Sequence, residues 1–261
     1  MLNLFRTPAV AGTTAAAASP LRRLWLRSEG SRRQAMDIVA VIATLLAINL
    51  TAHFTPLSTA AATVPVGVVA LLAYAKLRGM TWGDLGLSKD NARKGVRWGS
   101  GAAIVVLTAV GIALAIPTTR GFFFNESYAN VRHAVLAALI IIPLQTVLPE
   151  ELAFRGILHG SLTRLGGTKL AFIAGSMLFG LWHIASSLNL SATNAGLTSV
   201  LGTGSFAQWV AVGLAVVATS AAGAGLTWLR HHTGSVWAPV GLHWALNAVG
   251  ALAAALAWQM L

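Results

Sequence analysis

Long apolar segments alternate with short polar ones along most of the chain. Seven of them have the ~17–25 residues that a helix needs to cross the hydrocarbon core of a bilayer. None shows the short apolar–polar alternation of a transmembrane β-strand. The pattern predicts an all-α fold, a polytopic transmembrane bundle of about seven helices, at residues 37–54, 60–76, 98–116, 132–156, 169–188, 207–229 and 236–258.

The composition supports this prediction and excludes several chemistries. Hydrophobic residues make up 56% of the chain and charged residues 10%, whereas soluble domains carry about 25% charged residues. Most of the surface must therefore face lipid. The chain has no cysteine, which excludes disulfides, thiolate nucleophiles and cysteine-ligated metals. We expect a multi-pass protein of the cell membrane, and compact loops without cysteine suit a bacterial one.

The formal net charge of +11 lies mainly beside the apolar segments. Nearly all lysines and arginines precede the first, third, fifth and seventh segments, and the positive-inside rule then places the N-terminus in the cytoplasm. We expect these basic regions to contact anionic lipids. No nucleic-acid recognition module accompanies the charge, so nucleic acid is not an expected partner. The two largest basic clusters are Arg22, Arg23, Arg27, Arg32 and Arg33, and Lys76, Arg78, Lys89, Arg93, Lys94 and Arg97.

The same pattern divides the chain into three parts. Residues 1–36 are rich in alanine and arginine and are expected to form a basic cytoplasmic tail. Residues 37–131 hold the first membrane helices and a basic cytoplasmic loop. Residues 132–258 form a membrane core that contains most of the polar residues found inside apolar segments.

Two of the seven acidic residues, Glu150 and Glu151, stand side by side at the end of an apolar stretch. A carboxylate at membrane depth costs about 2.5–3.5 kcal/mol on insertion scales and usually marks a function. Glu151 and Arg155 are four residues apart and share a helix face, which allows an ion pair. Glu150 points about 100° away and is expected to face an internal cavity. The alternative is that both acids pair with basic groups and only hold helices together.

A second polar position is His183, which shares a helix face with Phe179. A lone histidine in an apolar helix is more often a packing residue than a catalyst. However, Glu150 and His183 lie equally far from the turn at Gly166 and Gly167. If both helices reach that turn, the two side chains lie at one depth, as acid/base chemistry requires.

A third pair, His243 and Asn247, also lies four residues apart on one helix face. Together they could direct an imidazole N–H and an amide N–H at one point. Two fixed donors at a developing oxyanion stabilise it by about 2.7–4 kcal/mol each. The alternative role is hydrogen bonding between helices.

The order Glu-Glu-x-x-x-Arg, Phe-x-x-x-His and His-x-x-x-Asn resembles the CPBP family of intramembrane proteases. This family includes type II CAAX prenyl endopeptidases and related bacteriocin-processing or immunity proteins. The motifs that match are Glu150-Glu151 with Arg155, Phe179 with His183, and His243 with Asn247. The resemblance covers residues 132–258, which it implies are the catalytic core.

The resemblance implies hydrolysis of a peptide bond by water, without an acyl-enzyme, in a peptide or membrane-protein substrate near the cytoplasmic side. It makes Glu150 the general base and gives His183 the task of holding the water or sharing its proton. His243 and Asn247 would stabilise the oxyanion. Glu151, Arg155 and Phe179 would support the site.

Several alternatives remain open at this level. We expect no cofactor, but Glu150, His183 and His243 could supply the three protein ligands of a catalytic zinc ion. The same scaffold could serve a non-catalytic immunity or partner-binding protein. A proton-coupled transporter could use Glu150 and His183 as a relay, although no internal repeat supports it. The sequence does not name the substrate or the oligomeric state.

Overall fold

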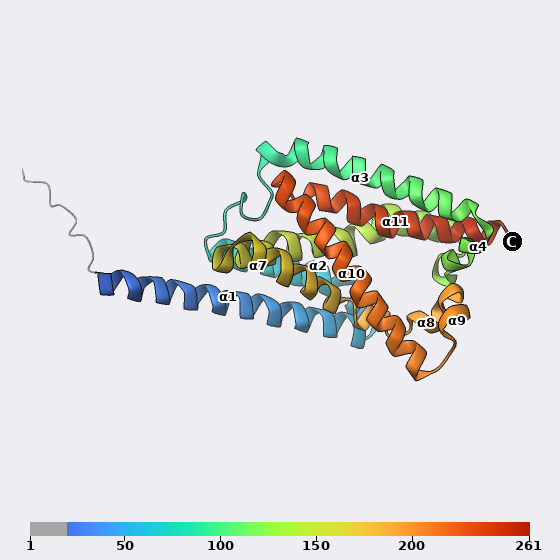
Figure 1. Ribbon diagram of the computed structural model, residues 1–261, viewed down its shortest axis with the longest axis horizontal. Helices are drawn as coiled ribbons and strands as arrows, with labels where there is room; N and C mark the ends of the chain where they lie inside the picture. Colours follow the sequence, from blue (N-terminus) through green and yellow to red (C-terminus); the bar gives the residue numbers. More distant parts are fainter. Residues whose placement is uncertain (1–19) are drawn as a thin grey trace, which may run out of the picture.

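The computed structural model describes residues 20–261, apart from the side chains of residues 20–29, 57–61, 191, 192 and 195. All secondary structure in this range is helical, which confirms the predicted fold class, and the long helices form one elongated bundle (Figure 1). The long helices are α1 (Pro20–Phe54), α2 (Leu57–Leu77), α3 (Lys89–Ala115), α7 (His159–Trp182), α10 (Ser205–Thr233) and α11 (Trp237–Gln259). The shorter ones are α4 (Pro117–Arg120), η1 (Gly121–Phe123), η2 (Glu126–Tyr128), α5 (Val131–Leu136), η3 (Ala137–Val147), α6 (Leu148–Glu151), η4 (Leu152–Leu158), η5 (Ala185–Ser187), α8 (Leu190–Thr193) and α9 (Ala195–Leu201).

Five helical stretches within residues 20–261 are long and apolar enough to cross a membrane, and they indicate a multi-pass membrane protein. They are Gly30–Phe54, Lys89–Ala115, Val131–Trp182, Ser205–Thr233 and Trp237–Gln259. Val131–Trp182 has 52 residues and contains the predicted span at 132–156 and most of the one at 169–188. The described part of α2, Ala62–Leu77, is also apolar but shorter than these five. The count of seven spans and the cytoplasmic N-terminus stay predictions.

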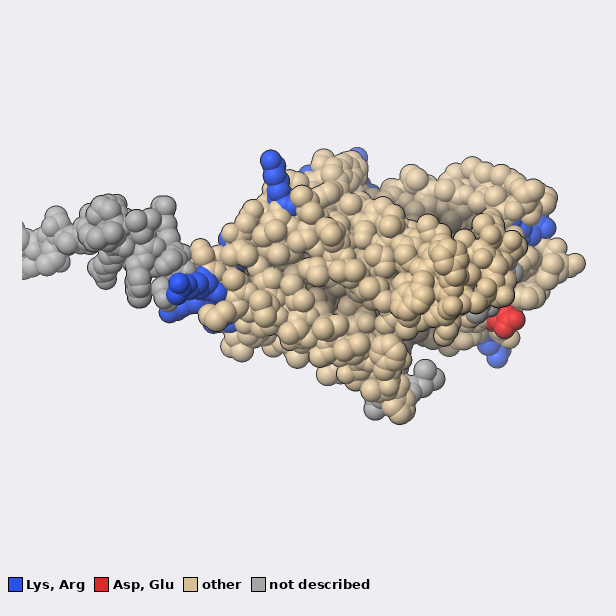
Figure 2. All heavy atoms as spheres, turned by 60° about the horizontal axis from the view of Figure 1, so that its bottom comes forward, with Lys and Arg blue, Asp and Glu red and all other residues tan. Residues whose placement is uncertain are grey.

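The distribution of charge on the surface fits a bundle that lies in a bilayer. Figure 2 shows one face of the molecule, where most visible lysines and arginines lie toward the end at which α1 begins. A few charged groups mark the opposite end, and the wide area between the two ends is uncharged. An uncharged band between charged ends is the surface that a membrane-spanning bundle needs.

Helix α1 begins at Pro20, inside the region predicted as a tail at residues 1–36. Residues 1–19 of that predicted tail lie outside the described residues. The apolar pattern of the sequence predicts only the part of a helix that can lie in lipid, which here begins at residue 37. The helix itself continues beyond that part, because its backbone hydrogen bonds are made within the segment.

The predicted turn between two spans is present at Gly166 and Gly167. Gly167 has a φ of 78°, a left-handed conformation that favours glycine. Phe154 before the turn and Phe179 after it have ring centroids 5.2 Å apart, so the two legs are antiparallel neighbours. The second leg ends at Trp182, earlier than the predicted end of the span at residue 188.

Hydrogen bonds and an ion pair hold the polar segment at residues 79–88 against the basic end of the bundle. Arg230 of α10 is buried and donates from Nη2 to the Asp84 carbonyl oxygen at 2.9 Å. Arg164 donates to the Asp84 carboxylate at 2.8 Å. Partial burial alone would raise the pKa of the Asp84 carboxyl, but hydrogen bonds from Thr81 and Arg164 hold that pKa below its ordinary value. The segment therefore links α7 and α10.

Glycines bring α3 and α11 into close contact. A Cβ atom on Gly99 would lie 2.8 Å from the Trp237 carbonyl oxygen, and one on Gly241 would lie 2.7 Å from backbone atoms of Gly99. Small residues at such crossings let helix backbones approach closely in a membrane. The contact fixes the start of α11, and so the position of His243 two residues beyond Gly241.

The close crossing predicts different effects for two glycine substitutions on α3. Gly99→Ala should lower the free energy of unfolding by roughly 1–3 kcal/mol, because its methyl group meets the backbone of α11. Gly101→Ala is the matched control, since a Cβ atom there meets nothing within 4 Å. Thermal unfolding in detergent, followed by tryptophan fluorescence, would compare the variants. Equal midpoints would show that the crossing does not depend on Gly99.

Candidate active site

The segment that carries Glu150 and Glu151 is a short α-helical turn between two wider helices. The flanking segments η3 and η4 are π-helical, and α6 lies between them. Pro143 and Pro149 lack the backbone N–H that a regular α-helix would use at these positions. Wide turns of this kind occur often at functional sites because they redirect side chains. The sequence prediction of one regular helix over 132–156 missed this irregularity.

Glu151 is fully buried, and its carboxylate is shared by two partners. Arg155 Nη1 donates to Glu151 Oε1 at 3.0 Å, which is the ion pair that the spacing predicted. His243 Nδ1 lies 2.8 Å from the same oxygen. An ionised carboxylate only accepts hydrogen bonds, so the His243 Nδ1 atom carries a proton and donates it. Glu151 thus orients the imidazole of α11, a contact that the sequence did not reveal.

Arg155 is held on several sides. Its guanidinium carbon lies 3.9 Å from the centre of the Phe179 ring, and Nη2 donates to the Gly223 carbonyl oxygen at 3.4 Å. The Phe179 ring also meets the rings of His183 and His243, with centroids 4.7 and 5.7 Å apart. Phe179 therefore contacts the buried cation and both imidazoles.

Glu150 faces a different set of groups from its neighbour. Trp182 Nε1 donates to Glu150 Oε1 at 3.1 Å. Within the described part of the chain, Glu150 Oε2 is buried and has no hydrogen-bond partner. This oxygen lies 3.9 Å from His243 Nε2. One carboxylate oxygen is thus fixed, and the other is directed at an imidazole.

Trp182 is the site residue that the sequence reasoning missed. The sequence did indicate this position. Trp182 lies as far from the Gly166–Gly167 turn as Glu150 does, to within one residue, which is the argument that led to His183. A tryptophan in an apolar helix gives no further sign of a polar contact. Only the rotation of the second leg determines which of the two residues meets Glu150.

His183 lies at the end of α7, and its ring folds back on that helix. Its Nδ1 atom donates to the Phe179 carbonyl oxygen at 2.7 Å, which leaves Nε2 as an acceptor. Among the described residues, no hydrogen bond joins His183 directly to Glu150. The two residues are brought to one region, as the spacing predicted, but are connected through Trp182 and Phe179.

Asn247 lies one helical turn beyond His243 on α11 and is half-buried. Its side chain makes no hydrogen bond to the residues that the structure describes. The predicted set is therefore gathered as follows: Glu150, Glu151, Arg155, Phe179, His183 and His243 form a connected cluster, and Asn247 lies at its edge with a free amide.

A zinc ion would need three protein ligands around one point. Residues 20–261, as far as their side chains are described, contain no group of three His, Asp or Glu side chains placed to hold a metal. Glu150, His183 and His243 thus do not fit a zinc site in this arrangement.

Comparison with known proteins agrees with the motif order. Residues 132–249 match the family model described as type II CAAX prenyl endopeptidase Rce1-like. The matched range contains every residue of the cluster and Asn247. No curated protein and no solved structure matched the chain.

The two adjacent glutamates should differ in their effect on stability. Glu151→Gln should lower the free energy of unfolding by about 3–5 kcal/mol, because it leaves the buried Arg155 without a carboxylate. Glu150→Gln should cost less than about 1.5 kcal/mol, since glutamine still accepts from Trp182. Unfolding in denaturant, measured in detergent, would compare them.

A double variant provides the control for this comparison. Adding Arg155→Met to Glu151→Gln removes both charges and should restore part of the lost stability. Additive losses in the double variant would contradict the role of Glu151 as the partner of Arg155.

Proposed function

We propose that this chain is an intramembrane endopeptidase that uses Glu150 as its general base. It belongs to the CPBP family through its Rce1-like type II CAAX prenyl endopeptidase domain at residues 132–249. The observation that carries the proposal is the environment of that carboxylate. One oxygen is held by Trp182, and the other is buried, without a partner among the described residues, and 3.9 Å from His243 Nε2. A buried base with one open oxygen is suited to take a proton from water.

In this mechanism, water gives a proton to Glu150 Oε2, and the hydroxide attacks the carbonyl carbon of the peptide. His183 Nε2 accepts a hydrogen bond from the same water, because Nδ1 donates to the Phe179 carbonyl. The tetrahedral intermediate then collapses, and the leaving amine takes the proton from Glu150. Water is consumed, and no covalent enzyme intermediate forms.

The oxyanion is stabilised by His243 and Asn247. His243 donates from Nε2 as an imidazolium, and Glu151 supports that charge through its hydrogen bond to Nδ1. The amide of Asn247, free of partners among the described residues, is the second donor.

The reaction takes place nearer the basic end of the bundle. His243 lies six residues after Trp237, the first residue of α11, so it is about 9 Å along the helix from that end. The full helix has 23 residues and spans about 35 Å. The positive-inside rule assigns the basic end to the cytoplasm, so we place cleavage on the cytoplasmic side.

An apolar cavity beside Glu150 provides a place for a hydrophobic part of the substrate. This cavity of about 200 Å³ lies between α1 and α7 and is lined by Leu45, Phe154, Leu181 and Trp182 among others. The Trp182 ring lines the cavity while its N–H holds Glu150. A prenyl group, which the family description names, has the apolar character that such a cavity binds.

Quantitative mass spectrometry of new peptide termini in membranes tests the activity. Cells that express the unaltered protein should show termini that are absent with Glu150→Gln, because glutamine cannot take the proton. Glu126→Gln is the matched control, since this exposed glutamate lies on η2 outside the cluster. Its termini should equal those of the unaltered protein.

Two results would contradict the proposal in different ways. Normal cleavage by Glu150→Gln would assign the general base to another residue. No new termini with any variant, at equal abundance and folding, would favour the immunity or partner-binding role on the same scaffold.

The contact of Trp182 with Glu150 gives a second test. Trp182→Phe keeps an aromatic ring in the cavity but loses the donor to a carboxylate, so kcat should fall about 10–100-fold with little change in KM. Trp258→Phe is the control, because that N–H bonds the Asn125 carbonyl oxygen away from the cluster. A change confined to KM would show that Trp182 acts only through the cavity.

A further inference from the structure

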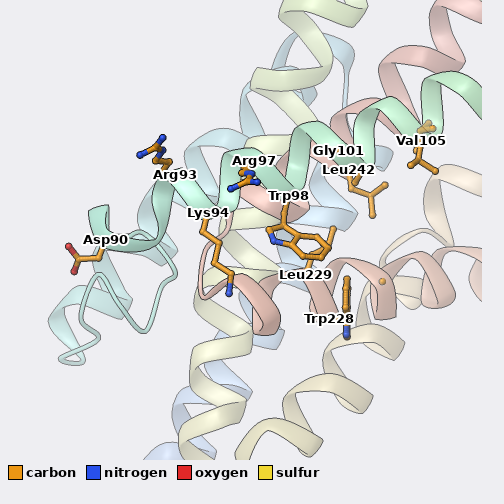
Figure 3. Close-up of a pocket in the computed structure, with 13 residues that line it drawn as sticks. Asp90, Arg93, Lys94, Arg97, Trp98, Gly101, Val105, Trp228, Leu229 and Leu242 are labelled. Atoms are coloured by element: carbon orange, nitrogen blue, oxygen red, sulfur yellow. The ribbon is translucent and has the colours of Figure 1, made fainter.

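A second, larger cavity lies on the other side of α11 from the carboxylates. It has a volume of about 1210 Å³ and runs between α3 and α10, with Leu242 of α11 at its floor (Figure 3). This volume exceeds the roughly 300–1,000 Å³ of most small-molecule sites. We refer to it as the α3–α10 groove.

One end of the groove is strongly basic. Arg93, Lys94 and Arg97 of α3 line it, together with a single acid, Asp90. Asp90 accepts from the Ser88 hydroxyl at the start of α3, and both Asp90 and Arg93 are directed away from the apolar part in Figure 3. Three cations against one carboxylate leave this end at +2. It is complementary to an anion.

The two arginines at this end are available to a ligand. Both are exposed, and neither has a hydrogen bond or ion pair to the residues that the structure describes. Lys94 differs, because its Nζ donates to the His232 carbonyl oxygen at 2.7 Å. Arg93 and Arg97 are therefore the groups that can bind a phosphate without giving up an existing partner.

Aromatic rings mark the boundary between the basic end and the apolar walls. Trp98 of α3 meets Trp228 of α10 edge to face, with centroids 5.9 Å apart. Trp228 also stacks on His232 at 5.2 Å. Tryptophan is enriched at the level of lipid headgroups, where one side of the ring is apolar and the N–H is hydrated. The rings place the basic end at the membrane surface.

Beyond these rings, the groove is apolar and reaches into one leaflet. From Trp98 to Val106 it follows eight residues of α3, or about 12 Å, somewhat less than half of the ~30 Å hydrocarbon core. Gly101 and Gly225 line it, and the space beside each is open, since a Cβ atom there would meet nothing within 4 Å. Val105 is 68% exposed, so the wall opens laterally toward lipid.

We propose that the α3–α10 groove binds one anionic phospholipid, with its phosphate at Arg93 and Arg97 and its acyl chains along the apolar wall. The basic end, the aromatic boundary and an apolar wall that stays within one leaflet together match such a lipid and no soluble anion. A substrate is less well matched, because no carboxylate or imidazole of the cluster lines the groove: Leu242 lines it, whereas the neighbouring His243 contacts Glu151.

Native mass spectrometry of the full-length protein in detergent tests this site. The probes are phosphatidylglycerol and phosphatidylcholine with identical acyl chains. We expect one phosphatidylglycerol to be retained with at least about tenfold higher affinity than phosphatidylcholine, a difference of about 1.4 kcal/mol. Arg93→Gln with Arg97→Gln should reduce the preference to near unity. Arg32→Gln with Arg33→Gln is the control of equal charge change, on exposed residues of α1 outside the groove, and should keep it.

Filling the groove gives an independent arm. Gly101→Leu with Gly225→Leu should abolish retention of both lipids, whereas Gly111→Leu, at an exposed and open position of α3, should not. If the filled variant does not fold, the two arginine pairs decide the question. No preference for phosphatidylglycerol, or an equal loss with the control pair, would overturn the proposal.

The same samples identify a different occupant. A prenylated peptide with a free carboxyl terminus could displace the bound lipid in competition. If it did, and if the filled variant also lost proteolysis in lipid-free detergent, the groove would belong to the substrate and the lipid proposal would be wrong. The lipid measurement does not depend on proteolysis, so its failure and that of the proposed function remain distinguishable.

Discussion

The carboxylate of Glu151 joins parts of the chain that are far apart in sequence. It accepts from Arg155 on its own helix and from His243, 92 residues away on α11. Arg155 in turn lies on the Phe179 ring of α7 and donates to the Gly223 carbonyl of α10. None of these charged groups could be buried alone, because a single ion in an apolar interior costs far more than a pair. This shared carboxylate therefore sets the relative positions of α6, α7, α10 and α11.

The arrangement gives two neighbouring carboxylates different environments. Glu151 is engaged by a fixed cation and an imidazole, whereas Glu150 has only an indole N–H. The second oxygen of each is buried without a partner among the described residues, and that of Glu150 lies 3.9 Å from His243 Nε2. The first environment keeps a charge in place. The second leaves a group able to exchange a proton, which is how paired acids come to serve separate purposes at one site.

Helix packing on the other side of α11 follows a different principle. Glycines let the backbone of α3 rest on that of α11, while the same helix stands apart from α10 and leaves the α3–α10 groove. Gly99 is needed for the contact, and Gly101, two residues later, faces the groove. One helix thus combines a close interface with an open, lipid-facing wall, because residues two apart point in nearly opposite directions.

The sequence by itself determined the features that depend on local spacing. Apolar length predicted helices, the four-residue interval predicted the pair of Glu151 and Arg155, and Gly166–Gly167 predicted the turn. Only the tertiary structure decided that His243 shares that carboxylate, that Trp182 meets Glu150, and that the helix around them has π turns. It also decided where α1 begins and which glycines touch α11. These features depend on how each helix is rotated and crossed against its neighbours. Periodicity along one segment fixes which residues share a face, but the partner of that face is set by contacts between segments distant in the chain.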